Sequence, residues 1–178
     1  MYISNPNLEN RPVELERLIL AGNFLDNVDK ENLSLTAWVT HVPSAIFKPT
    51  PEEPCGTIAC GMGWLTFDPN FQALGLRLIG IRPTIFKDTE ELSTLDTIKH
   101  LFGGRYDTVF MDVFSNRGDS RFDKNLGVKF TGYDDYDNPI LGGDDVSDKT
   151  LLMYRIDQLT AELSGEIPVT QPTDNEEN

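Results

Sequence analysis

Apolar residues recur at intervals of three and four positions in four parts of the chain, which is the spacing of one helix face. These parts are residues 11–28, 93–104, 106–115 and 147–163. Pro12 suits the start of the first helix, and Gly103 suits the end of the second. The expected apolar faces consist of Leu15, Leu18, Ile19, Gly22 and Leu25; Leu95, Ile98, Leu101 and Phe102; Val109, Phe110, Val113 and Phe114; and Leu152, Ile156, Leu159 and Leu163.

Shorter apolar runs predict strands. LRLIGI (76–81) predicts a short strand that ends at Pro83, and GVKFTGY (127–133) with NPIL (138–141) predicts a hairpin. This hairpin falls within residues 115–147, an Asp- and Gly-rich stretch that we expect to project from the body. The predicted fold class is therefore α+β and mainly helical: a compact helical body with a small β-hairpin excursion.

The length and composition of the chain predict its domain organisation. A chain of 178 residues with 39% hydrophobic residues can bury one core, so we expect a single globular domain over residues 1–164. Residues 165–178 contain four acidic residues, two prolines and no basic residue, which predicts an acidic mobile tail.

The acidic charge narrows the classes of partner. The formal net charge is −14 and the pI is about 4.4. Nucleic acids and anionic membranes are bound through Lys and Arg, so both are disfavoured as direct partners. No apolar run approaches the roughly 18 residues of a membrane span, and the first residues do not follow the pattern of a secretory signal. We therefore expect a cytoplasmic protein, and no motif calls for a cofactor.

The stretch PCGTIACGMGWLTFDP (54–69) contains both cysteines of the chain. Thr57 is a favourable N-cap for a helix over residues 58–67, and the Asp68-Pro69 pair would end that helix. Cys60 would then lie in the first helical turn, where the helix dipole and unpaired N–H groups stabilise a thiolate.

That position allows a reactive interpretation. In a cysteine-dependent hydrolase, Cys60 or Cys55 would be the nucleophile, and His41 or His100 would be the base. No Asn or Asp is placed so that the sequence marks it as the third, orienting member. The cysteines are four residues apart, which does not match a Cys-x-x-Cys redox pair, and the ligand spacing of a zinc site is missing. We therefore expect no metal.

The alternative interpretation is packing, and we favour it. A free cysteine packs as a small hydrophobic residue, and its small neighbours would let another helix approach closely. Trp64 and Phe67 would anchor the same helix in the core. On this interpretation the stretch is a structural motif formed by Cys55, Gly56, Thr57, Cys60, Gly63 and Trp64.

A second candidate site is the run of tyrosines and carboxylates at residues 133–137. It lacks the residue order of an EF-hand loop, so a solvated acidic turn is favoured over a calcium site. Tyrosines beside carboxylates are typical of binding surfaces, and a structural tyrosine pair over the hairpin is an equal alternative. The predicted binding residues are Tyr133, Asp134, Asp135, Tyr136 and Asp137.

Three arginines could hold an anionic ligand: Arg82, Arg117 and Arg121. Surface ion pairs are the favoured interpretation of scattered arginines in so acidic a chain.

The motif in CGTIACGMGW resembles the Cys-Gly-Thr-x-x-Cys-x-x-Gly motif of a family of small bacteriophage and bacterial proteins without an assigned activity. The phrase DPNFQALGL (68–76) and the later helices extend the resemblance over most of residues 12–163. The 115–147 stretch looks like an expansion of the family pattern. The resemblance implies an accessory protein of a phage or mobile element that works in the bacterial cytoplasm, and it carries over no catalytic residue.

These observations lead to three hypotheses of function. The first is a non-enzymatic protein that binds a host or phage protein, such as a component of host defence, through the 115–147 excursion. The second is the cysteine-dependent hydrolase. The third is an acidic mimic of DNA that inhibits a DNA-binding enzyme, which requires carboxylates in rows on one face. The sequence leaves the oligomeric state open.

Overall fold

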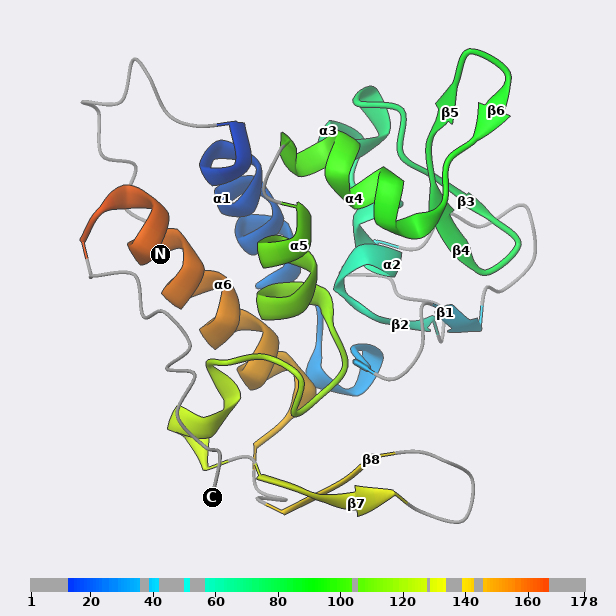
Figure 1. The fold of residues 1–178 in the computed structure, drawn as a ribbon. Coiled ribbons are helices and arrows are strands. Elements are labelled where there is room, and N and C mark those ends of the chain that lie inside the picture. Colours follow the sequence, from blue (N-terminus) through cyan, green and yellow to red (C-terminus); the bar gives the residue numbers. More distant parts are fainter. Residues whose placement is uncertain are drawn as a thin grey trace.

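The computed structural model describes residues 13–35, 39–41, 50–51, 57–103, 106–127, 129–133, 139–142 and 146–166 (Figure 1). Its helices are α1 (Val13–Leu25), α2 (Gly61–Leu65), α3 (Pro69–Ala73), α4 (Thr94–Phe102), α5 (Tyr106–Val109) and α6 (Asp148–Ser164). Shorter helical turns are η1 (Lys30–Asn32), the π-helical η3 (Phe110–Phe114) and η4 (Asp123–Leu126). The strands are β1 (Val39–His41), β2 (Ile58–Ala59), β3 (Arg77–Ile79), β4 (Arg82–Thr84), β5 (Phe86–Lys87), β6 (Glu90–Glu91), β7 (Lys129–Tyr133) and β8 (Pro139–Gly142).

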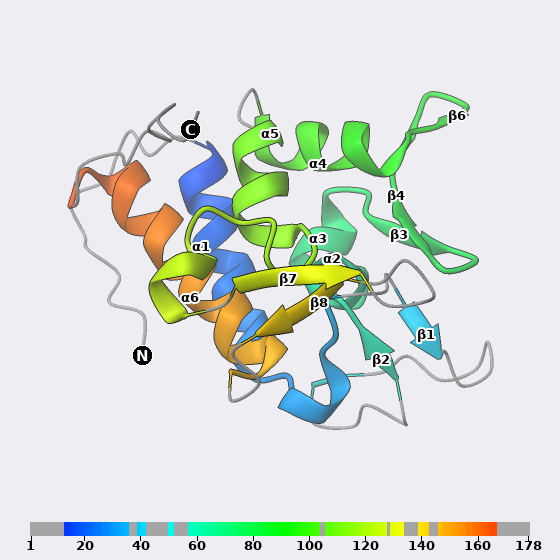
Figure 2. The ribbon, with the colours of Figure 1, turned by 60° about the horizontal axis from the view of Figure 1, so that its bottom comes forward.

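The helices pack around α1. This helix contacts α2, α4 and α6, and it buries Leu15, Leu18 and Leu25 at the predicted spacing. Figures 1 and 2 show α6 beside α1, with α5 and η3 on the same side of the molecule. The predicted helices at the two ends of the described chain are therefore neighbours in space.

The described strands form four separate antiparallel pairs, each of two strands. The pairs β1–β2, β3–β4 and β5–β6 lie on the side of the molecule away from α6 (Figures 1 and 2). The pair β7–β8 is the predicted hairpin, in which Lys129 pairs with Gly142 and Tyr133 pairs with Pro139. Helices with a few short hairpins confirm the predicted α+β, mainly helical fold class.

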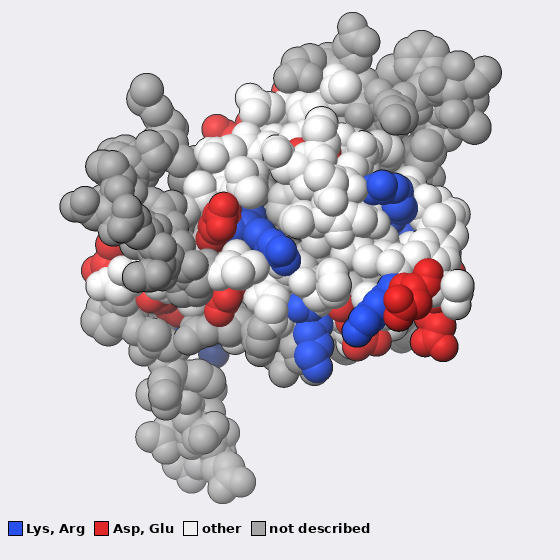
Figure 3. Space-filling view, turned by 90° about the horizontal axis from the view of Figure 1, so that it is seen from above, with Lys and Arg blue, Asp and Glu red and all other residues white. Residues whose placement is uncertain are grey.

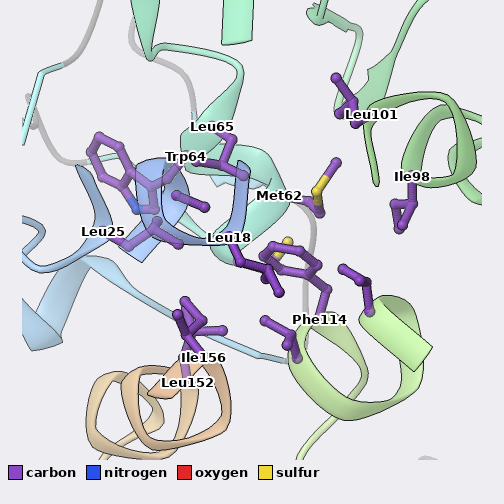
Figure 4. Close-up of a cluster of buried hydrophobic side chains, with 14 of the residues drawn as sticks. Leu18, Leu25, Met62, Trp64, Leu65, Ile98, Leu101, Phe114, Leu152 and Ile156 are labelled. Carbon is purple, nitrogen blue, oxygen red and sulfur yellow. The ribbon is translucent and has the colours of Figure 1, made fainter. Parts of the chain in front are cut away.

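The centre of the core is the short helix α2. Trp64 and Met62 are fully buried, and the indole Nε1–H of Trp64 donates a hydrogen bond of 2.9 Å to the carbonyl of Asn32. Figure 4 shows side chains of α1, α4, η3 and α6 converging on these α2 residues. The buried hydrophobic residues from Leu18 to Leu159 form one cluster, so distant parts of the sequence share one core.

The helix predicted over residues 58–67 begins only at Gly61 in the structure. Ile58 and Ala59 are extended, because Ala59 pairs with Val39 of β1. Cys60 is the N-cap of α2, and its Sγ accepts a hydrogen bond of 3.4 Å from the N–H of Gly63. Thr57 is buried, and its hydroxyl makes no hydrogen bond to any described residue. A tertiary strand pairing therefore overrides the local capping preference at Thr57.

The Asp68-Pro69 boundary is confirmed. Asp68 is extended and caps α3 by accepting a hydrogen bond of 2.8 Å from the N–H of Asn70. Pro69 is the first residue of α3, where its missing N–H costs nothing.

Two predictions near the hairpins are wrong. Leu95 is 46% exposed, and Thr97 is buried in its place because its hydroxyl accepts a hydrogen bond from the N–H of Ile85. Pro83 does not end a strand but lies inside β4, opposite Leu78. Proline is tolerated there because each strand of a two-stranded sheet is an edge strand, where a missing N–H donor can be accommodated.

The expected excursion over residues 115–147 divides into two parts. Residues 115–127 belong to the body, because Phe122, Asp123 and Ser120 are buried. The β7–β8 hairpin leaves the helical body at the bottom of Figure 1, as predicted. The predicted tail lies outside the described residues from residue 167 onward. Among the described helices, none combines the length and the apolar character that a membrane crossing requires.

Candidate functional site

Cys60 lies in an environment that suppresses ionisation. It is 4% exposed and belongs to the hydrophobic core, next to Gly61 and Ala59. Burial raises the pKa of its thiol to about 11, although the hydrogen bond from the Gly63 N–H opposes that rise. A nucleophilic cysteine needs access and a lowered pKa. These properties support the packing interpretation of Cys60.

The expected bases are not brought to Cys60 within the described residues. His100 is exposed on α4, whereas its neighbours Ile98 and Leu101 point into the core. The backbone of His41 belongs to β1, but its side chain lies outside the described residues, as do Cys55 and Gly56. The described residues therefore show no thiol–imidazole pair.

Alkylation of Cys60 tests this environment. In a Cys55→Ser variant, we expect iodoacetamide to leave Cys60 unlabelled in the native protein at about pH 8, because its thiol is both buried and protonated. Intact mass after timed exposure measures the labelling, and the same variant in denaturant is the control that must label fully. Rapid native labelling with a midpoint well below ~8.5 would support the hydrolase instead.

A buried ionic network, which sequence reasoning missed, joins α6 to residues 112–123. Arg155 is fully buried on α6, and all five of its N–H donors are used. Its Nε and Nη2 donate to the two carboxylate oxygens of Asp123, at 2.8 and 2.6 Å. The other donors bind the carbonyls of Val113, Ser115 and Asn116.

A second arginine extends the network. Arg121 donates from Nε to Asp112 at 2.9 Å and from Nη2 to Glu162, so its guanidinium lies between two buried carboxylates. The expected surface ion pairs of Arg117 and Arg121 are thus partly buried pairs, and Arg117 lies 3.8 Å from Asp148.

This network resembles a catalytic site only in part. Asp112 belongs to the π-helical turn η3, and such turns are frequent at functional sites. Burial raises the pKa of Asp112, which the nearby Arg121 guanidinium opposes. Both carboxylates are bound by the guanidinium and shielded from solvent, with Asp112 7% and Glu162 6% exposed. We interpret the network as the attachment of residues 112–123 to α6.

The raised pKa of Asp112 predicts how stability depends on pH. The native state holds this proton more tightly than the unfolded state, so ionisation above the raised pKa costs stability. We expect the free energy of unfolding of the wild type to rise relative to that of Asp112→Asn as the pH falls from about 7 toward ~4. Urea unfolding of both proteins measures the difference, and an opposite slope would contradict the burial of this carboxylate.

The most exposed apolar side chains gather in the hairpin part of the chain. Seven large hydrophobic residues of the described chain are exposed, and five of them lie in the stretch that runs from β2 to the first turn of α4. We call these five residues the hairpin surface: Ile58 (37%), Ile79 (42%), Ile81 (60%), Phe86 (51%) and Leu95 (46%). The other two are Val13 and Met111. Exposed apolar side chains that belong to one part of a fold are candidates for contact with a partner.

The side chains of the predicted binding residues 133–137 lie outside the described residues. The backbone of Tyr133 ends β7, but its side chain and residues Asp134, Asp135, Tyr136 and Asp137 lie outside the described residues. Figure 3, which views the molecule from above, shows a broad uncharged area with small separate groups of acidic and basic side chains. This face does not show the rows of carboxylates that a DNA mimic requires.

Comparisons with protein-family models, with curated proteins and with solved structures find no match to this chain.

Proposed function

We propose that this chain is a non-enzymatic protein that acts by binding another protein through the hairpin surface. The observation that carries the proposal is the concentration of exposed apolar side chains in residues 58–95. Ile81 lies at the tip of a hairpin and is 60% exposed. Covering its apolar surface with a partner would therefore stabilise the complex.

The charge of this part of the chain also supports protein binding. Residues 58–95 contain three Lys or Arg and four Asp or Glu, so their formal charge is −1 out of −14 for the whole chain. Most of the repulsive charge is therefore carried elsewhere, and the hairpin surface can approach another protein at low electrostatic cost. The motif resemblance to phage and bacterial proteins makes a protein of the bacterial host the partner that we propose.

The hydrolase hypothesis has less support. Cys60 is buried with a raised pKa, and the described histidine side chain, that of His100, is exposed on another helix.

Capture with matched variants tests the proposal. The immobilised chain is exposed to a bacterial lysate, and retained proteins are identified by mass spectrometry. We compare the wild type with Ile81→Asp and with Val13→Asp, which changes a residue 48% exposed at the start of α1. We expect the wild type and Val13→Asp to retain the same protein, and Ile81→Asp to retain at least about tenfold less, because central apolar contacts dominate interfaces.

Circular dichroism confirms that each variant is folded before capture. Equal retention by all three proteins would exclude the hairpin surface as the binding site. Absence of any retained protein would overturn the proposed function itself.

A further inference from the structure

In one segment of this acidic chain, every charged residue is basic. Residues 69–87 contain three basic residues (Arg77, Arg82 and Lys87) and no acidic residue, whereas the whole chain has 15 Lys or Arg against 29 Asp or Glu. The segment includes the β3–β4 hairpin and three residues of the hairpin surface: Ile79, Ile81 and Phe86. Positive charge and exposed apolar side chains therefore coincide in one short segment.

The strand register places these groups on a common face. Ile79 pairs with Arg82, and Arg77 pairs with Thr84, so Arg77, Ile79 and Arg82 point to the same side of β3–β4. All three are exposed, whereas Thr84, which lies on the same side opposite Arg77, is buried where the hairpin joins the body. The opposite side carries Leu78, which packs against the core, and the buried Pro83. The hairpin thus presents an isoleucine between two arginines.

The arrangement is held in place by the body. The Nη1 of Arg77 donates to the carbonyls of Gln72 and Leu76, at 2.6 and 2.7 Å, which orients its guanidinium. Gly80 has a φ of +61° and completes the two-residue turn with Ile81. Groups that are already oriented lose less conformational entropy on binding.

We propose that the β3–β4 face binds a protein segment that is both acidic and apolar, a proposal that rests on the proposed function. Arginine pairs with carboxylates through two parallel hydrogen bonds, and Ile79 between the arginines supplies an apolar contact. The adjoining β5–β6 hairpin carries Asp88, Glu90 and Glu91, and it repels an acidic partner. The contact is therefore centred on β3–β4.

Other occupants fit less well. Three basic residues among 29 acidic ones do not favour a nucleic acid, whose binding requires many cationic contacts. A second copy of the chain would bring a further net charge of −14 close to the first.

Paired charge reversals test the chemistry of the partner. The probe is the protein retained by the wild-type chain, purified after nuclease treatment, and the readout is its dissociation constant at low and high salt. We expect Arg77→Glu/Arg82→Glu to weaken binding at least about tenfold at low salt, and the wild-type affinity to fall as salt rises. The matched double variant Glu90→Lys/Glu91→Lys should keep or increase the affinity, because it removes repulsion.

Each other outcome overturns this inference in its own way. Weakening by the Lys variant alone identifies a basic partner, and no change in either variant, with Ile81→Asp still harmful, identifies a purely apolar one. Loss of retention after nuclease identifies a nucleic acid, and retention of untagged chain identifies a second copy. In the basic and purely apolar cases the proposed function stands. If Ile81→Asp also binds normally, the proposed function fails as well.

Discussion

Replacing Arg155 by Met should lower the free energy of unfolding by about 3–5 kcal/mol, the largest loss that we expect from a single substitution. The variant leaves the carboxylate of Asp123 buried without its cation, with that residue 1% exposed. It also removes the donors of three carbonyls, those of Val113, Ser115 and Asn116. Urea unfolding followed by tryptophan fluorescence measures the loss.

A double-mutant cycle separates the ion pair from the other bonds. Asp123→Asn with Arg155→Met should cost less than the sum of the two single variants, because no unpaired charge remains buried. Arg155→Lys should recover only part of the stability, because an ammonium cannot supply the planar, five-donor geometry. If Arg155→Met unfolds within about 1 kcal/mol of the wild type, the network is not what attaches residues 112–123 to α6.

Gly61→Ala should destabilise the protein by about 1–3 kcal/mol, because the core has no space for the added methyl group. A Cβ at this position would lie 3.0 Å from Cδ2 of Leu152 and 3.1 Å from Cε1 of Phe114. Small residues at the start of α2 therefore let α6 and η3 approach closely, which is the packing role predicted for this stretch. The same unfolding experiment measures the loss.

The control for Gly61→Ala is a second substitution, at Leu152, that vacates space for the added methyl group. Leu152→Ala alone removes a fully buried side chain and should cost about 2–5 kcal/mol. In the double variant the new methyl group occupies part of the vacated space, so the combined loss should be smaller than the sum. Strict additivity would contradict the close contact between Gly61 and Leu152.

Much of the fold could be predicted because its signals are local. Helical spacing identified α1 and α6, and Ser147 caps α6 by accepting a hydrogen bond from Thr150. Asp68 and Gly103 marked helix boundaries through their own backbone preferences. The errors at Thr57 and Leu95 have a different origin, because each depends on a neighbour distant in sequence: β1 in one case and Ile85 in the other.

The buried network could have been found from one signal. Arg155 stands three residues after Leu152 and one before Ile156, so it falls on the apolar face predicted for α6. A charge on such a face is expected to be paired. Its partner, Asp123, lies in the stretch that the sequence predicts to project from the body, and only the tertiary structure joins the two.

The hairpin surface was not predicted. The sequence predicts a short strand for LRLIGI but not its exposure: Ile79 and Ile81 are exposed because only one face of the two-stranded hairpin is covered by the body. Apolar character in a strand shows that it can be buried, and not that the fold supplies the layer that buries it. Conversely, the prediction that Cys60 packs in the core rested on its small neighbours, and its burial supports that interpretation.

The most direct test of the binding surface is photo-crosslinking from single positions in the full chain. A photoreactive amino acid is placed at Ile81 in one protein and at Val13 in another, two exposed positions on different parts of the described surface. After illumination in a bacterial lysate, we predict that the Ile81 protein forms a covalent adduct with one partner protein, and that the Val13 protein does not. Adducts of equal yield from both positions, or an adduct from Val13 alone, would contradict partner binding through the hairpin surface.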